Sequence, residues 1–312
     1  MHVHRYPEGL PAGARGAVVA IGNFDGVHLG HQAVIAAAGG IARAAGAPQA
    51  LLSFEPHPRS FFQPAAPPFR LTPFRAKAEL LRRLGVDLLF SLRFDRRMAQ
   101  RSAEDFVRDI LVGGLALRHA VVGYDFVFGR GRHGTAALLT QMGQELGFDV
   151  TIVEPVRAGA ELYSSTRIRE LLQAGDPRRA AALLGRSWEI DGRVERGDRR
   201  GRTIGFPTAN LLLDGYLRPA TGVYAVRAGL GRDGAWHDAV ANFGMRPTVG
   251  GTQLRLEVHI FDFAGDLYGR HLRVALVDYL RGERKFSGLD ALKAQIAADG
   301  AQARAILTAR EG

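Results

Sequence analysis

A chain of 312 residues is long enough for two domains with separate hydrophobic cores. Its 46% hydrophobic and 23% charged residues exclude a disordered or fibrous protein, and the absence of cysteine excludes disulfides, thiol nucleophiles and cysteine metal ligands. The net charge is +10. Because the arginines are scattered and no basic run alternates with aromatics, we assign this charge to a solvated surface and expect no nucleic-acid partner.

The expected cellular location follows from the lengths of the apolar segments. No apolar run approaches the roughly 20 residues of a membrane helix, and the N-terminal segment MHVHRYPEGLPAG has no signal-peptide core. We therefore expect a cytoplasmic protein with no membrane partner. The sequence does not indicate the oligomeric state, so a homo-oligomer stays open.

Apolar segments alternate with amphipathic segments over the first 185 residues. Apolar runs predict buried strands at residues 17–21, 50–54, 86–92, 120–123 and 150–153. Helical periodicity predicts helices near residues 30–45, 73–84, 102–112, 135–147 and 166–174. This alternation is typical of a doubly wound α/β domain with a parallel sheet, which we place at residues 1–184.

The pattern changes after Trp188, where glycines become frequent. Residues rich in β-formers follow at 222–228, 237–243, 254–263 and 272–280, and one helix is expected near 288–298. Residues 254–260, LRLEVHI, alternate with period two, as a half-buried antiparallel strand does. Residues 185–312 are therefore predicted to form a small antiparallel β-barrel with a C-terminal helix.

A first candidate nucleotide site follows the first predicted strand, where residues 22–31 read GNFDGVHLGH. Glycines let the backbone approach a phosphate closely, and the start of the next helix supplies free N–H groups. His28 and His31 can donate hydrogen bonds to a phosphate that gains charge in a transition state. A histidine pair could also ligate a metal, but the strand–loop–helix position favours phosphate chemistry.

Several motifs resemble those of one known family. Residues 28–31, HLGH, resemble the HxGH signature of the nucleotidylyltransferase superfamily, and GNFDGVHLGHQ resembles the bacterial bifunctional riboflavin kinase/FAD synthetase family in particular. Further matches are FEPHP at 54–58, GYDF and FG within 123–129, and SSTRIR at 164–169. The hydroxyls and arginines of this last motif, at the start of a helix, also suit a triphosphate by themselves.

The resemblance implies a Rossmann-like domain in which the FMN phosphate attacks the α-phosphorus of ATP and releases pyrophosphate. His28 and His31 would be catalytic. ATP would be bound by Gly22, Asn23, Phe24, Asp25, Gly30, Ser164, Thr166 and Arg167. The flavin would contact Phe54, His57, Phe62, Asp125 and Phe126, with His57 as a wall of the site rather than a catalyst.

The chain departs from the family pattern at two positions. Val127 stands where the family commonly has arginine, and Thr135 stands where it commonly has an acidic residue. Both positions bear on how the flavin or a phosphate is held. Neither lies in the HxGH or the serine–threonine–arginine motif.

A second candidate nucleotide site is the segment GRTIGFPTAN at residues 201–210. Its composition alone predicts a rigid turn with neutral oxygens of the kind that Mg²⁺ accepts, and no Walker A motif occurs in the chain. The segment resembles the PTAN motif of riboflavin kinases, and NFGMRPT at 242–248 and LRGERKF at 280–286 continue the pattern. The resemblance implies ATP binding by Gly201, Gly205, Pro207, Thr208 and Asn210, Mg²⁺ binding by Thr208 and Asn210, flavin binding by Arg281, Glu283 and Phe286, and Glu257 as general base.

The sequence therefore predicts an enzyme that phosphorylates riboflavin to FMN and then adenylylates FMN to FAD, with ATP and Mg²⁺. The alternative is a nucleotidylyltransferase-like module that binds RNA or a protein partner and has inactive sites. An adenylyltransferase for another acceptor would leave the kinase-like second half unexplained. An NAD-dependent dehydrogenase is disfavoured because no GxGxxG follows the first strand. A flavoprotein that uses flavin only as a redox cofactor would be separated from this prediction by its lack of ATP turnover.

Overall fold

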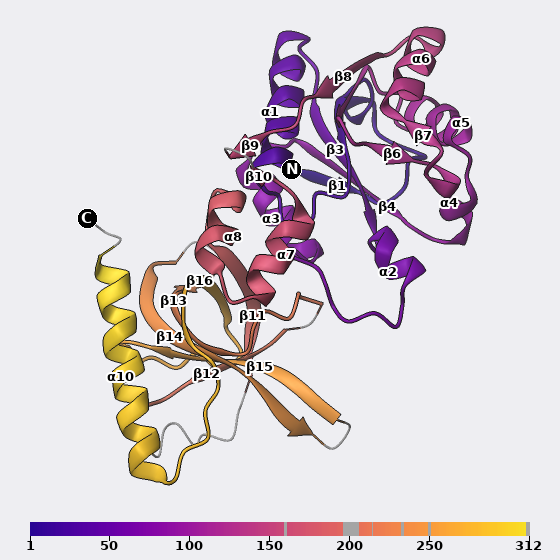
Figure 1. Cartoon of the computed structure of the whole chain (residues 1–312). Coiled ribbons are helices and arrows are strands. Elements are labelled where there is room, and N and C mark those ends of the chain that lie inside the picture. The colour runs from indigo at the N-terminus through magenta and orange to yellow at the C-terminus, as the bar shows by residue number, and fades with distance from the viewer. Residues whose placement is uncertain (159–160, 196–205, 214, 232–233, 249–250, 310–312) are drawn as a thin grey trace. The chain divides into compact units, whose positions relative to one another are not determined.

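The computed structural model describes residues 1–312 except 159–160, 196–205, 214, 232–233, 249–250 and 310–312 (Figure 1). The chain divides into two compact units. The first comprises Met1–Pro67 and Thr72–Ser164, and the second comprises Pro68–Leu71 and Ser165–Gly312. We refer to them below as the first unit and the second unit.

The first unit is built on a six-stranded sheet. In order across the sheet the strands are β1 (His2–His4), β4 (Leu88–Arg93), β3 (Gln49–Glu55), β2 (Val18–Ile21), β5 (His119–Gly123) and β8 (Asp149–Val153). All neighbouring strands run parallel. The five predicted strands are therefore confirmed. Strand β1 was not predicted from the sequence, because this edge strand has only three residues, two of them histidines, and no apolar run.

Helices cover both faces of this sheet. They are α1 (Leu29–Ala44), α2 (Pro58–Phe62), α3 (Phe74–Arg83), α4 (Arg96–Gln100), α5 (Ala103–Asp105), the π-helical segment η2 (Phe106–Gly114) and α6 (Ala136–Leu146). Short elements complete the unit: η1 (Ala12–Ala14), η3 (Arg130–Arg132), the pair β6 (Val127–Phe128) and β7 (Gly134–Thr135), and the pair β9 (Arg157–Ala158) and β10 (Glu161–Leu162).

Successive residues of the central strand β2 enter different hydrophobic cores. Val18 and Ala20 lie in the core that includes α1 and α3, whereas Val19 and Ile21 lie in the core that includes η2 and α6. This follows from the alternation of side chains along a strand. Figure 1 shows α1 and α6 on opposite sides of the sheet, which confirms the predicted doubly wound architecture.

The second unit contains a closed antiparallel barrel. Its strands, in order around the barrel, are β11 (Trp188–Glu195), β12 (Ala209–Leu212), β15 (Gly251–Ile260), β14 (Trp236–Thr248), β13 (Gly222–Leu230) and β16 (His271–Arg281), and β16 pairs with β11 to close it. The helices α7 (Ser165–Gln173), α8 (Pro177–Leu184) and α10 (Leu289–Thr308) belong to the same unit. The predicted barrel and C-terminal helix are confirmed.

Alternate residues of β13 pack on the two sides of the barrel wall. Val223 and Ala225 lie in a core with Ala303 and Leu307 of α10, and α10 runs along the outside of the barrel (Figure 1). The side chain of Tyr224 points the other way and is 1% exposed. The long helix therefore docks on the outer face of the barrel through its last two turns.

The second unit includes a short segment from early in the chain, Pro68–Leu71. Trp188 Nε1 donates a hydrogen bond to the carbonyl oxygen of Leu71 at 2.8 Å, and Arg70 forms an isolated bridge with Tyr216. The two compact units thus separate between Ser164 and Ser165. The predicted boundary between the functional domains at residue 184 stays a prediction.

None of the helices in the described ranges combines the length and the apolar character needed to cross a membrane.

Candidate active sites

The connection from β2 to α1 holds the two histidines of the HLGH motif together. His28 is the N-cap of α1, and its Nδ1 accepts a hydrogen bond from the backbone N–H of His31 at 3.3 Å. The two imidazole rings stack with centroids 3.6 Å apart. A Cβ at Gly30 would lie 3.2 Å from the His28 ring, so a glycine here leaves that ring in place.

The loop before these histidines has an uncommon backbone. Phe24 and Val27 have φ of 50° and 45°, a region that side chains other than glycine rarely adopt. The loop is held by Thr72, whose Oγ1 accepts from Gly26 N at 2.8 Å and whose N–H donates to Asp25 Oδ1 at 3.0 Å. Strained backbone that is held this firmly is typical of binding loops. The buried carboxylate of Asp25 therefore fixes the loop.

Lys77 lies beneath the same loop and is 1% exposed. Its Nζ donates to the carbonyl oxygen of Asn23 at 3.2 Å and to Ser53 Oγ at 2.9 Å. Neither Thr72 nor Lys77 was predicted from the sequence, because neither lies in a recognised motif. A signal was present for Lys77, which is one of three lysines among 41 basic residues.

Phe24 and Gly30 complete the packing around the histidines. The Phe24 ring lies 5.2 Å from the His31 ring, and a Cβ at Gly22 would lie 3.2 Å from Phe24. A Cβ at Gly30 would also lie 3.5 Å from Tyr163 Cβ. Of the predicted ATP-binding residues, the structure thus groups Gly22, Asn23, Phe24, Asp25 and Gly30 in one loop with the two histidines.

The serine–threonine–arginine motif begins α7. Ser164 directly precedes this helix and is the last residue of the first unit, whereas Thr166 and Arg167 lie in the first turn, in the second unit. Arg167 Nη1 lies 3.1 Å from Glu170 Oε2, in a largely exposed pair. An exposed pair of this kind contributes little to stability.

Three predicted flavin contacts belong to one network of phenylalanine rings. Phe54, Phe62 and Phe126 are linked through Phe94, Phe106 and Phe128, which were not assigned to the site from the sequence. Ring centroids are 5.8 Å apart for Phe62–Phe94, 5.6 Å for Phe54–Phe94, 6.1 Å for Phe54–Phe106, 5.6 Å for Phe106–Phe128 and 5.3 Å for Phe126–Phe128. Phe62 is 63% exposed, so the network runs from the core to the surface.

The other two predicted flavin contacts, His57 and Asp125, differ in their surroundings. His57 is buried and is the N-cap of α2, where its Nδ1 accepts from the N–H of Arg59 at 3.1 Å. Asp125 is exposed, and its Oδ1 lies 3.3 Å from the point where a Cβ on Gly123 would stand.

The two departures from the family pattern lie opposite each other. Val127 of β6 pairs in register with Thr135 of β7. Thr135 also caps α6, because its Oγ1 accepts from the N–H of Leu138 at 3.2 Å. An arginine opposite an acidic residue would form a cross-strand ion pair, whereas valine opposite threonine needs none. The pair of Val127 and Thr135 therefore brings no opposite charges together, and Thr135 caps the helix.

Three polar residues form a row across the barrel. Asn210 of β12 and Asn242 of β14 both pair in register with Glu257 of β15, so all three side chains leave the sheet on the same face. Val223 pairs in register with Asn242 and packs against α10, which places the row on the outer face of the barrel. The sequence pointed to Asn210 and Glu257 but gave no role to Asn242.

The PTAN segment leads directly into this row. Asn210 Nδ2 donates to the carbonyl oxygen of Thr208 at 3.4 Å, and His259 Nδ1 lies 2.8 Å from the carbonyl oxygen of Pro207. Gly201 and Gly205 lie outside the described residues. Within the described ranges no group of three or more His, Cys, Asp or Glu residues could hold a metal. Thr208 and Asn210 nevertheless offer the neutral oxygens that suit Mg²⁺ when phosphates complete its ligands.

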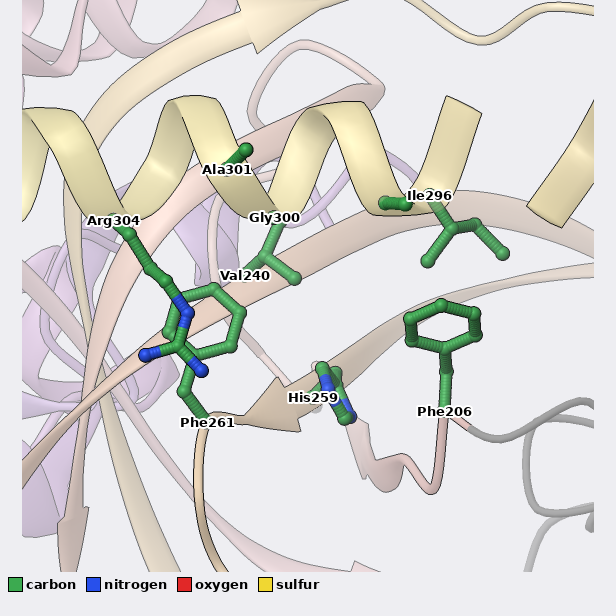
Figure 2. Close-up of a pocket in the computed structure, with 9 residues that line it drawn as sticks. Phe206, Val240, His259, Phe261, Ile296, Gly300, Ala301 and Arg304 are labelled. Carbon is green, nitrogen blue, oxygen red and sulfur yellow. The ribbon is translucent and has the colours of Figure 1, made fainter. Parts of the chain in front are cut away.

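A cavity of about 280 Å³ lies beside the row, between the outer face of the barrel and α10 (Figure 2). It is lined by Phe206, Val240, His259, Phe261, Ile296, Ala297, Gly300, Ala301 and Arg304. The rings of Phe206 and His259 lie 5.6 Å apart, and the Arg304 guanidinium carbon lies 4.2 Å from the centroid of Phe261. Aromatic walls with one cation suit a planar, electron-rich ligand.

The predicted flavin contacts of the second unit lie at the end of β16 and in the residues that follow it. A Cβ at Gly244 would lie 2.9 Å from Glu283 Oε1 and 3.0 Å from Asn242 Nδ2, so Glu283 lies over β14 next to the polar row. Arg281 forms an ion pair with Asp299 of α10 at 2.6 Å. Its guanidinium carbon lies 5.8 Å from the centroid of Phe286.

Comparisons with known proteins agree with the activity that the sequence predicts for each half of the chain. A family model described as FAD synthetase matches residues 10–167, and one described as riboflavin kinase matches residues 184–307. A solved structure from Streptococcus pneumoniae, described as a macrolide-efflux protein, has a TM-score of 0.85 at 33% identity, over 97% of this chain and 98% of that one.

Curated relatives extend over nearly the whole chain. A bifunctional riboflavin kinase/FMN adenylyltransferase of Escherichia coli is 46% identical over 93% of this chain and 92% of its own. Proteins with the same name from Pseudomonas fluorescens and Bacillus subtilis are 45% and 39% identical, over 94% and 91% of this chain and 93% and 90% of their own. These matches do not favour the alternative of a binding module with inactive sites. The chain belongs to the bifunctional riboflavin kinase/FMN adenylyltransferase family, whose members phosphorylate riboflavin to FMN and adenylylate FMN to FAD.

Proposed function

We propose that the two reactions take place at the two sites described above. FMN adenylylation is assigned to the loop at residues 22–31 and its surroundings, and riboflavin phosphorylation to the outer face of β12, β15 and β14. The observation that carries this proposal is the position of Glu257, which lies in register between Asn210 and Asn242 and next to an aromatic cavity. The assignment follows the order of the two matching families along the chain.

In the first site, the stacked His28 and His31 donate hydrogen bonds to the phosphates of ATP. An FMN phosphate oxygen forms a bond to the α-phosphorus, and the bond to pyrophosphate breaks. This reaction requires no covalent intermediate, so positioning and charge stabilisation supply the catalysis. ATP is bound further by Gly22, Asn23, Phe24, Asp25, Gly30, Ser164, Thr166 and Arg167. The flavin is bound by Phe54, His57, Phe62, Asp125 and Phe126.

In the second site, Glu257 accepts the proton of the riboflavin hydroxyl as the hydroxyl oxygen attacks the γ-phosphorus of ATP. The bond from this phosphorus to the bridging oxygen of ADP breaks, and ADP leaves. Along the outer face of β15, His259 and the cavity lie on one side of Glu257, and Arg255 lies on the other side. Arg255 pairs with Gly244, over which Glu283 lies. Glu257 therefore stands between the proposed nucleotide site and the proposed flavin site, as a general base requires.

We assign the adenine of this second ATP to the cavity of Figure 2. The cavity begins at Phe206, directly before Pro207, Thr208 and Asn210, which would bind the phosphates together with Gly201 and Gly205. Thr208 and Asn210 would hold Mg²⁺, which supplies charge neutralisation at the phosphates when bound. The flavin would be bound by Arg281, Glu283 and Phe286.

The remaining expectations concern location and partners. We propose a cytoplasmic enzyme whose partners are riboflavin, FMN and ATP, with no nucleic-acid or membrane partner. Scattered arginines support this, because they offer no concentrated basic surface.

The test is chromatography of the flavins after the purified chain is incubated with riboflavin, ATP and Mg²⁺. We expect FMN to appear first and FAD later. Omitting Mg²⁺ should stop the formation of FMN. FMN without later FAD would contradict the assignment of the first site, and unchanged riboflavin would contradict the assignment of the second.

A further inference from the structure

Arg281 and Asp299 join the end of β16 to the middle of α10. Arg281 donates from Nε to Asp299 Oδ1 at 2.9 Å and from Nη2 to Asp299 Oδ2 at 2.6 Å. Gln295 Nε2 donates to the same carboxylate at 2.9 Å, and Asp299 is 4% exposed. The pair is thus bidentate and shielded from water, the arrangement in which charge-assisted hydrogen bonds are strong.

The same guanidinium also contacts the segment that follows it. Arg281 Nη1 donates to the carbonyl oxygen of Gly282 at 2.9 Å, and the Phe286 ring lies 5.8 Å from the guanidinium carbon. Arg281 therefore ties α10 to both ends of residues 282–286. Two residues of this segment, Glu283 and Phe286, are assigned to the flavin together with Arg281.

The opposite side of this segment is fixed by two glycines. A Cβ at Gly222 would lie 2.2 Å from the carbonyl oxygen of Arg281, and Gly222 has φ of 141°. A Cβ at Gly244 would lie 2.9 Å from Glu283 Oε1. Strands β13 and β14 thus pack closely against this segment at Gly222 and Gly244. A displacement of Arg281 would therefore move Glu283 relative to the polar row.

We propose that Asp299 is a positioning residue of the riboflavin kinase reaction. It holds Arg281, and through Arg281 it holds residues 282–286 where Glu283 and Phe286 meet the flavin beside Glu257. Asp299 touches no substrate itself. This role rests on the proposed assignment of the flavin to residues 282–286.

The docking of α10 does not depend on Asp299 alone. Ala303 and Leu307 of the helix lie in a core with β13, β14 and β16, and Arg304 forms two hydrogen bonds with Asp262 at 2.8 and 3.0 Å. A variant of Asp299 should therefore retain the helix on the barrel. The expected effect is then a change in flavin binding rather than loss of the fold.

The test is Asp299→Asn in the full chain, with both reactions measured. We expect the riboflavin KM of the kinase reaction to rise about tenfold, the effect of roughly one charge-assisted hydrogen bond. The ATP KM of the kinase and the rate of FMN adenylylation should be unchanged. A purely structural role would instead lower kcat through a smaller active fraction and leave both KM values as they were.

The matched control is Asp278→Asn, which removes another ion pair between β16 and a helix. Asp278 lies 2.5 Å from Arg178 of α8, and it lies three residues before Arg281. This control should leave the riboflavin KM unchanged. A rise as large as that of Asp299→Asn would overturn the proposal.

Two further variants separate the possible outcomes. Gln295→Leu keeps the ion pair and removes one donor, so it should raise the riboflavin KM about two- to threefold even if Asp299→Asn does not fold. Phe286→Ala tests the flavin assignment itself. If Phe286→Ala leaves the riboflavin KM unchanged, the flavin assignment fails. If Phe286→Ala raises the riboflavin KM but the Asp299 and Gln295 variants do not, the positioning role of Asp299 is overturned. The same holds if the Asp299 and Gln295 variants raise the KM for ATP as much as the KM for riboflavin.

Discussion

At residue 30 the space for a side chain is filled by the ring of His28. We expect Gly30→Ala to displace that ring, because the new Cβ would lie 3.2 Å from it, and to lower FMN adenylylation at least tenfold. Gly40 lies on the same helix, and no atom lies within 4 Å of the point where its Cβ would stand, so Gly40→Ala is the control. That control should retain activity and stabilise the helix by about 1 kcal/mol. Rates of FAD formation with supplied FMN, and thermal unfolding, measure both effects. Equal activity of the two variants would contradict the role of Gly30.

Glu257 allows a prediction about the chemical step alone. Glu257→Gln keeps the shape of the side chain and removes its ability to accept a proton. We expect the kinase kcat to fall by about 10²- to 10⁴-fold, with the ATP KM little changed. Adenylylation of supplied FMN by the same variant is the internal control. Turnover near that of the unmodified chain would show that Glu257 is not the base.

The sequence predicted residues whose role follows from local backbone and missed those whose role follows from distant contacts. The glycines and histidines of residues 22–31 form one loop, as expected from their position between a strand and a helix. Thr72 and Lys77 reach that loop from 46 and 54 residues away, and no local pattern marks them. For the same reason no local pattern marked the hydrogen bond between Arg281 and Asp299, 18 residues away, while the flavin contact of Arg281 stays a prediction.

At the level of the elements, the edge of the parallel sheet contains a titratable contact between β5 and β8. His119 Nε2 lies 2.8 Å from Thr151 Oγ1, and His119 pairs in register with Asp149. Burial lowers the pKa of His119 below its ordinary value, and the nearby Asp149 carboxylate opposes this in part. The folded chain therefore favours the neutral imidazole.

A pH dependence of stability follows from that lowered pKa. The stability from neutral His119 is fully present above its unfolded pKa of about 6.5 and is lost as the pH falls through the lower folded pKa. We expect His119→Gln, which cannot titrate, to reduce the fall in Tm of the first unit between pH 7 and pH 5. Thermal unfolding across this range measures it. An identical pH profile for both proteins would contradict the assignment.

Helix α10 forms one wall of the proposed adenine cavity, and Gly300 lies in that wall. A Cβ at Gly300 would make an ordinary contact with Phe261 at 3.7 Å. We expect Gly300→Ala to stabilise the helix by about 1 kcal/mol with little change in the ATP KM. Gly300→Leu should extend into the cavity and raise the ATP KM of the kinase, with the riboflavin KM unchanged. Steady-state kinetics with each substrate varied would distinguish this from a flavin-binding cavity, for which the riboflavin KM would rise.

The strength of each element's pattern explains which elements the sequence predicted. Continuous apolar runs gave the buried parallel strands, and alternation gave β15. The first barrel strand, β11, was missed because WEIDGRVE mixes charged residues and a glycine with its buried positions. Strand β12 has only four residues and begins inside the PTAN segment, which was predicted to be a turn, so the strand was missed. Helix α8 was missed although Asp176 caps it and proline begins it, which is a recognisable start signal.

For the whole molecule, the assignment of the two sites predicts activities that can be removed separately. His28→Ala with His31→Ala should stop FAD formation while FMN accumulates. Asn210→Ala should impair FMN formation while supplied FMN is still converted to FAD. Flavin chromatography measures both variants. Loss of both activities in either protein would contradict two independent sites.

The segment Pro68–Leu71 has a consequence for synthesis on the ribosome. Leu71 leaves the ribosome 117 residues before Trp188, the donor to its carbonyl oxygen. At ordinary bacterial rates of about 5–20 residues per second, this segment waits roughly 6–23 seconds for its partner. The first unit can fold during that interval, but the second unit cannot be completed from residues 185–312 alone. A gene fragment that begins at residue 185 would therefore encode a barrel whose first tryptophan lacks its acceptor.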